Sequence, residues 1–295
     1  MKASKGPYTI LPVLSLLLTA TLWGMVWYPL RLLEQAGLHG LWTTLISYSA
    51  ALLVGLGWLW SERGRWARYP LALPVMTAAA GWTNVAFVLA ILDGMVVRVL
   101  LLFYLSPLWA LLLGWLILGE KPRPGGWLVF ALAVSGAMIM LWDPAVGLPW
   151  PRDHADWLAV SSGFAFSMSN VMVRRMDRLS VRLKAAASWL GVVLVALAGV
   201  LIAGLPVPQV SAATLGGAVA LGWLGFVIMT LAVIYGVAHM PVHRSAVILL
   251  FELVVGAVSS LILTSEQVYP REWLGGSLIL ASAWLAAREQ AVRGE

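Results

Sequence analysis

The stretch between Arg98 and Glu120 constrains this chain more than any other, because no charged side chain lies between those two residues. Written as an α-helix, it runs about 33 Å at 1.5 Å per residue, which is enough to cross a hydrocarbon core of about 30 Å. Pro107 lies near its middle. The length and apolar character predict a membrane-spanning helix, and the proline predicts a break within it.

Similar apolar runs recur along the chain, which is 61% hydrophobic and only 11% charged. Soluble domains have about 25% charged residues, so this composition predicts a membrane protein. The runs are about twice the length of a membrane β-strand and lack strict alternation, which excludes a β-barrel reading. We predict an all-α integral membrane protein in which the first run is retained as a span and not cleaved as a signal peptide. Its ten expected transmembrane helices cover residues 10–30, 41–60, 71–92, 96–118, 127–142, 157–173, 184–203, 215–240, 245–263 and 273–287.

The basic side chains predict an orientation, because Lys and Arg remain in cytoplasmic loops. All but four of the 19 Lys and Arg residues fall on the side of the N-terminus, the exceptions being Arg31, Arg98, Arg152 and Arg271. We therefore expect both termini in the cytoplasm. We attribute the net charge of +6 to this orientation and to contacts with anionic membrane lipids. The sequence has no basic patch that would predict nucleic-acid binding.

The chain also contains an internal repeat. The matches at one common offset pair Arg98 with Arg244, Glu120 with Glu266, Pro124 with Pro270, Trp127 with Trp273 and Leu128 with Leu274. Each copy holds five spans, and an odd number makes the second copy insert upside down relative to the first. We predict two inverted five-helix repeats, residues 1–146 and 147–295, around a central cavity near the bilayer midplane.

A family resemblance rests on the Trp23-Gly24 pair and on RVLLLFYLSPLWALLLGWLILGE before a proline-rich turn, in a chain of five plus five helices. In these features the whole chain resembles the drug/metabolite transporter superfamily and its EamA-type exporters. The order of Tyr104, Ser106 and Pro107 is similar to the YddG-type aromatic amino acid exporters. The resemblance implies a multi-pass protein of a bacterial-type inner membrane, with a cavity lined by helices one, three, four, six, eight and nine. Relatives commonly repeat the proline in helix nine, where this chain has Leu253.

Polar and aromatic side chains deep in the spans are the candidates for binding a substrate, because each polar group there needs a partner. The helix break at Pro107 points to a cavity in the same region, since a loosened turn in hydrocarbon needs protein or water as its partner. A kink that only aids packing is the alternative. The predicted substrate-binding residues are Trp27, Trp82, Asn84, Tyr104, Ser106, Phe166, Asn170, Tyr235 and Glu252.

Several polar and charged residues in or beside the spans also have a purely structural explanation. Asn84 and Asn170 are equally suited to interhelical hydrogen bonds. Glu252 is the one carboxylate in mid-span, where it is either a neutral carboxyl bonded to a neighbouring helix or a group that receives an ammonium or a coupling proton. Glu266 is expected to accept from amides of the following helix, with a gating role as the alternative. Arg98 is expected to bind carbonyl ends of neighbouring helices or lipid phosphates.

The chemistry of these residues favours one substrate class. Without a mid-span Lys or Arg, the sequence lacks a fixed cation for sugar phosphates. Aromatic, amide and hydroxyl groups suit neutral, zwitterionic or cationic amphiphiles. The leading hypothesis is a secondary transporter that exports aromatic or other hydrophobic amino acids by alternating access. An exporter of other metabolites or cationic drugs is the alternative, and a membrane enzyme or structural subunit is disfavoured, because the chain has no cysteine and no nucleophile–base pair. We expect no metal and no cofactor, and the oligomeric state stays open.

Overall fold

The computed structural model describes residues 10–119, 124–143, 148–176, 178–239, 248–249 and 251–293. This part of the chain is helical apart from a two-residue ladder, in which β1 (Trp142–Asp143) pairs antiparallel with β2 (Leu148–Pro149). The predicted all-α membrane fold is confirmed. The helices are α1 (Ile10–Met25), α2 (Trp27–Gln35), α3 (Gly40–Ser61), η1 (Arg63–Arg68), α4 (Ala72–Asp93), α5 (Val96–Phe103), α6 (Ser106–Leu118), α7 (Pro124–Leu141), α8 (His154–Arg175), α9 (Val181–Ile202), α10 (Ala212–Ala220), η2 (Leu221–Val227), α11 (Ile228–Ala238), α13 (Phe251–Leu263) and α14 (Pro270–Arg293).

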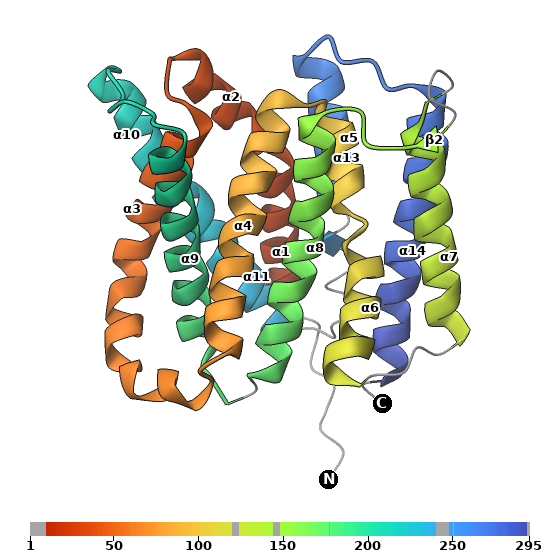
Figure 1. The fold of residues 1–295 in the computed structure, drawn as a ribbon, viewed down its shortest axis with the longest axis horizontal. Helices are drawn as coiled ribbons and strands as arrows, with labels where there is room; N and C mark the ends of the chain where they lie inside the picture. The colour runs from red at the N-terminus through yellow and green to blue at the C-terminus, as the bar shows by residue number, and fades with distance from the viewer. Residues whose placement is uncertain are drawn as a thin grey trace.

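These helices form two sets of passes through the bundle. The first set is α1 with α2, α3, α4, α5 with α6, and α7; the second is α8, α9, α10 with η2 and α11, α13, and α14. In Figure 1, α1 begins at the end of the molecule where α14 finishes, whereas α8 begins at the opposite end. The second set therefore runs inverted relative to the first. We term these two ends the terminal end and the far end.

Length and composition identify some passes as membrane spans more clearly than others. Within the described residues, six helical stretches are long and apolar enough to cross a membrane: Ile10–Gln35, Gly40–Ser61, Ala72–Asp93, Val96–Leu118, Val181–Ile202 and Ala212–Gly236. Two further apolar helices, Gly125–Leu141 and Phe251–Leu263, are shorter. The helices α8 and α14 carry acidic residues in their first turns, Asp156 and Glu272, and both of these side chains are buried.

The two sets interlock, because each helix packs mainly on helices of the other set. The helix α1 packs against α11 and α13, while α8, its counterpart, packs against α4 and against α5 and α6. The helix α3 packs on α9, and α7 on α14. When each pass is exchanged for the pass of the same number in the other set, the contacts of α1 map onto those of α8, and the contacts α3–α9 and α7–α14 map onto themselves. The packing thus has the two-fold character expected of an inverted repeat.

The α-helical backbone is interrupted inside several passes. Val26 separates α1 from α2, and Tyr104 with Leu105 separates α5 from α6. The pass formed by α10 and α11 contains a π-helical segment, η2, of seven residues. Interrupted backbone at membrane depth is tolerated where protein or a water-filled cavity supplies hydrogen-bond partners, and π-helical segments are frequent at functional sites.

Candidate functional site

The break between α5 and α6 has a local cause in Pro107, the second residue of α6. Proline has no backbone N–H, so it cannot serve the carbonyl of Phe103 one turn earlier. Gly163 of α8 faces that carbonyl, and a Cβ at position 163 would lie only 2.6 Å from its oxygen. Ser167, one turn further along α8, donates a hydrogen bond of 2.7 Å to the carbonyl of Ser106. The helix α8 therefore lies directly against the broken turn.

The side chain of Tyr104 leaves this turn toward the second repeat. Its hydroxyl donates a hydrogen bond of 3.1 Å to Oε2 of Glu252, the second residue of α13. A carboxylate in the first turn of a helix interacts favourably with the helix dipole. The Tyr104–Glu252 pair thus joins the fourth pass of one repeat to the fourth pass of the other, beside the break between α5 and α6.

Aromatic rings of both repeats gather around Phe103, next to Tyr104. The ring of Phe103 lies 5.8 Å from that of Tyr104, 5.3 Å from that of Phe87 and 5.3 Å from that of Phe166. Phe166 is 40% exposed although it lies in the middle of α8. Partly exposed rings near a tyrosine hydroxyl can hold the apolar part of an amphiphile.

A second contact between the repeats lies along α1, α2 and α13. Gly24 lets α1 approach α13 closely, since a Cβ at position 24 would lie 2.6 Å from the carbonyl oxygen of Glu252. Beyond Val26, the indole of Trp27 is buried and donates a hydrogen bond of 3.0 Å to Oγ of Ser259. Trp27 is therefore bound to α13, the helix that also carries Glu252.

The other predicted site residues lie on α4 and α8. Asn84 accepts a hydrogen bond from the hydroxyl of Tyr48 on α3 and donates one of 2.9 Å to the carbonyl of Ala80. Trp82, 42% exposed, donates a hydrogen bond of 3.2 Å to Oγ of Ser161. Asn170 is exposed near the end of α8. Asn84 and Trp82 thus join α4 to α3 and to α8, and none of these hydrogen bonds involves Tyr104 or Glu252.

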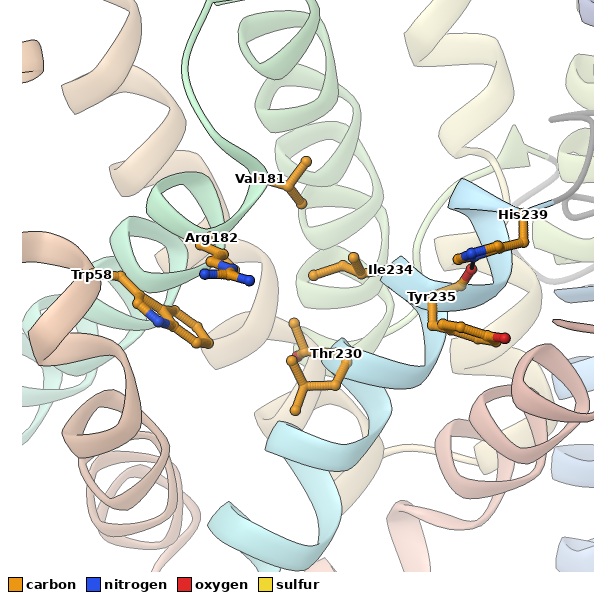
Figure 2. A pocket seen from close by; sticks show the side chains of 9 residues that line it. Trp58, Val181, Arg182, Thr230, Ile234, Tyr235 and His239 are labelled. Carbon is orange, nitrogen blue, oxygen red and sulfur yellow. Dashed lines mark hydrogen bonds between the residues drawn. The ribbon is translucent and has the colours of Figure 1, made fainter. Parts of the chain in front are cut away.

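Tyr235 lies elsewhere, in a cavity of about 570 Å³ at the terminal end. Figure 2 shows Trp58 of α3 and Arg182 of α9 on one side of this side pocket, and on the other Tyr235 of α11 and His239, which follows the end of α11. The sequence predicted only Tyr235 among these residues. Trp58 was not among the predicted binding residues, because it lies near the basic loop at the end of its span, where aromatic residues are ordinary.

The far end is held together by buried ion pairs. Arg98, 4% exposed, binds Asp156 through two contacts of 2.7 Å, and its NH1 approaches Glu272 at 3.4 Å. The expected carbonyl partner is present as well, since Arg98 donates to the carbonyl of Met140 at the end of α7. The sequence missed both carboxylate partners, which lie in α8 and α14.

Arg31 and Glu266 form a second ion pair at the far end, with 2.8 Å between NH1 and Oε1. Glu266 also accepts a hydrogen bond of 2.9 Å from the amide of Val96. Its capping partner is therefore α5 of the first repeat and not the following helix α14, which corrects the expectation drawn from the sequence. Glu120 and Arg244, the repeat equivalents of Glu266 and Arg98, lie outside the described residues.

Comparison with known proteins matches this architecture to one family. The model of the EamA-like transporter family matches residues 10–142 and again residues 154–288, once for each set of passes. An uncharacterized transporter of Pseudomonas aeruginosa is 30% identical over 143 residues, which is 44% of this chain and 45% of that protein. The chain thus aligns with somewhat less than half the length of this curated relative. A solved crystal structure, 17% identical, superposes over 93% of this chain and 96% of its own with a TM-score of 0.57, which supports the fold.

Proposed function

Because the chain belongs to the EamA-like transporter family, we propose that it exports aromatic or other hydrophobic amino acids from the cytoplasm by alternating access. The Tyr104–Glu252 pair carries this proposal. A carboxylate and a phenol beside partly open aromatic rings offer an acceptor for an ammonium group and surface for an apolar side chain.

The position of the pair between the repeats favours transport. The residues come from the two fourth passes, and each residue lies at or beside a helix end inside the bundle. A relative movement of the repeats therefore changes the surroundings of Glu252 without unfolding any helix. Inverted repeats of this kind support alternating access around a site near the midplane.

The two ends of the molecule differ in a way that suits a state closed at the far end. Arg31–Glu266 and the Arg98–Asp156–Glu272 cluster tie the far end, whereas the side pocket opens at the terminal end. With the terminal end in the cytoplasm, as the basic residues indicate, this arrangement corresponds to access from the cytoplasm. Export then requires the Arg31–Glu266 pair, which bridges the two repeats, to separate.

Efflux from proteoliposomes tests the proposal. Vesicles with purified protein are loaded with radiolabelled phenylalanine, tyrosine, leucine or alanine, and release is followed with and without a pH gradient. We expect phenylalanine, tyrosine and leucine to leave faster than from protein-free vesicles, and faster than alanine does. If none of the aromatic amino acids is released, the proposed substrate class is wrong.

Substitution of Glu252 by Gln separates a transport role from a structural one. Gln keeps the size and a hydrogen bond to Tyr104 but cannot carry a charge or a proton. We expect efflux to fall and to lose its dependence on pH, while the protein keeps its elution profile in size-exclusion chromatography. Tyr104→Phe is the matched control, because it removes the hydrogen bond but leaves the carboxylate. Unchanged efflux by Glu252→Gln from acidic to mildly alkaline pH would make Glu252 a structural residue.

Export of cationic drugs or other metabolites is the second candidate, and the same carboxylate favours it. Glu252 lies against the phenol of Tyr104 and makes no ion pair within the described residues, a combination that also attracts an organic cation. Adding radiolabelled tetraphenylphosphonium to the panel distinguishes the two. Release of this cation without release of any amino acid would favour the second candidate.

A further inference from the structure

The side pocket holds a kind of group that the Tyr104–Glu252 pair lacks, namely a fixed cation. Arg182 lies in the first turn of α9, and its exposed side chain makes no ion pair with any carboxylate in the described part of the chain. The N-terminal end of α9, where Ser180 caps the helix, adds partial positive charge. The electrostatics of this side of the pocket therefore favour an anion.

The rest of the pocket suits a ring. Trp58 closes it on the side of α3, where its indole lies 6.0 Å from that of Trp189. Tyr235 closes it on the side of α11, with its ring 4.3 Å from that of His239. From His239 the pocket continues along α11 past Ile234 to Thr230, a distance of about 13 Å at 1.5 Å per residue.

The hydroxyl of Thr230 at the inner end donates to the carbonyl of Phe226 at 2.7 Å, so this end contributes little free polar surface. The volume of about 570 Å³ lies within the range of about 300–1,000 Å³ found for small-molecule sites. The pocket thus combines a cation at its rim, rings on two walls and an apolar interior.

We propose that the side pocket is a cytoplasmic access site, in which Arg182 binds the carboxylate of an aromatic amino acid and the ring lies between Trp58 and Tyr235. This inference rests on the proposed export of amino acids. A zwitterion would then have its carboxylate recognised at the terminal end and its ammonium recognised by Glu252 deeper in the bundle. Neither position alone offers partners for both charges.

Binding of radiolabelled 3-phenylpropionate tests the pocket independently of transport. This compound has the ring and the carboxylate but lacks the ammonium, so it does not require Glu252. We expect equilibrium binding to detergent-solubilised protein, with the affinity lowered about tenfold or more by Arg182→Gln, since a charged hydrogen bond is lost. Arg68→Gln, an exposed arginine of η1 at the same end that does not line the pocket, is the matched control and should leave the affinity unchanged.

Efflux of phenylalanine gives the second measurement. Arg182→Gln should raise the internal concentration needed for half-maximal efflux about tenfold, with little change in the maximal rate. The amide of phenylalanine lacks the carboxylate, so the substitution should leave its efflux unchanged. An equal loss for both compounds, or no loss for either, would overturn the inference.

The two proposals fail in different ways. If 3-phenylpropionate binds in an Arg182-dependent manner but no amino acid is released, the pocket is an aromatic carboxylate site and the proposed export is wrong. If amino acids are released but Arg182→Gln changes neither binding nor efflux, the access site is wrong. If phosphatidylglycerol, added to the detergent, binds in an Arg182-dependent manner and 3-phenylpropionate does not bind, the pocket holds a lipid headgroup and the inference is overturned.

Discussion

Arg98 illustrates how single residues stabilise this fold. It is the one arginine among the described residues that is almost fully buried, and its guanidinium meets Asp156, Glu272 and the carbonyl of Met140. Asp156 in turn accepts from the amide of Arg152, and Glu272 from the amide of Tyr269. Each charge is therefore paired and hydrogen-bonded, which is the condition under which buried ions are tolerated.

Asp156→Asn should destabilise the protein by about 3 kcal/mol, because it leaves the buried guanidinium of Arg98 without its bidentate partner. Chemical unfolding in detergent, followed by circular dichroism, measures the loss. Arg65→Gln is the control, because it removes an ion pair with Glu62 in which the Arg65 side chain is half exposed, and such pairs contribute about 1 kcal/mol or less. Equal stability of the wild type and Asp156→Asn would contradict this account of the far end.

At the scale of elements, the sequence predicted the helices well and some of their interruptions poorly. The break before Pro107 has a local chemical cause and was expected. The break at Val26 also has a proline beside it, because Pro29 cannot donate to the carbonyl of Met25 one turn earlier, although we did not predict this break. The π-helical segment η2 contains no proline, and its apolar residues give no sign of it. At η2 the two repeats pack closely, since a Cβ at Gly222 would lie 2.2 Å from the carbonyl oxygen of Ser47.

The candidate site was predictable only in part, because contacts between distant parts of the chain leave no local pattern in the sequence. Depth in a span singled out Tyr104 and Glu252, but their pairing joins residues 148 positions apart. Arg182 and Trp58 gave no such signal, since both lie near the ends of helices, where basic and aromatic residues are ordinary. Only the packing of α3, α9 and α11 reveals that these side chains share a cavity.

Gly24→Ala should push α1 away from α13, because the added Cβ would lie 2.6 Å from backbone oxygen and 2.8 Å from Cβ of Val255. We expect a loss of about 1–3 kcal/mol in stability, as for other overpacked interfaces, and reduced efflux because Glu252 moves with α13. Stability is measured by the unfolding transition in detergent. Gly57→Ala in α3 is the control, since a Cβ there meets nothing within 4 Å, and replacing helical Gly by Ala stabilises by up to about 1 kcal/mol.

At the scale of the whole molecule, the distribution of charge and the inverted repeat agree on one arrangement in the membrane. The helix η1, with its arginines, lies at the terminal end, and the ion pairs of Arg31 and Arg98 lie at the far end. We expect the terminal end to face the cytoplasm. The chain has no cysteine, so single cysteines can be introduced without removing any.

Gly64→Cys and Gln209→Cys place a thiol at the two ends, in the exposed segments that follow α3 and α9. A membrane-impermeant maleimide should label position 209 in right-side-out vesicles and position 64 only in inside-out vesicles. Labelling after solubilisation controls for reactivity of each thiol. Labelling of both positions from the same side would refute the inverted arrangement, and a reversed pattern would refute the predicted orientation.

The interlocking of the repeats has a consequence for biosynthesis. Arg98 leaves the ribosome 58 residues before Asp156 and 174 residues before Glu272, so for much of translation its charge has no partner. An unpaired arginine is costly inside the hydrocarbon, which makes the nascent α5 favour a shallow position with Arg98 at the lipid headgroups. Full burial of α5 then awaits the arrival of α8 and α14. Membrane insertion of the first five passes is thereby a separate event from their final packing. The last helix to emerge, α14, completes the charge pairing that holds the fourth pass in place.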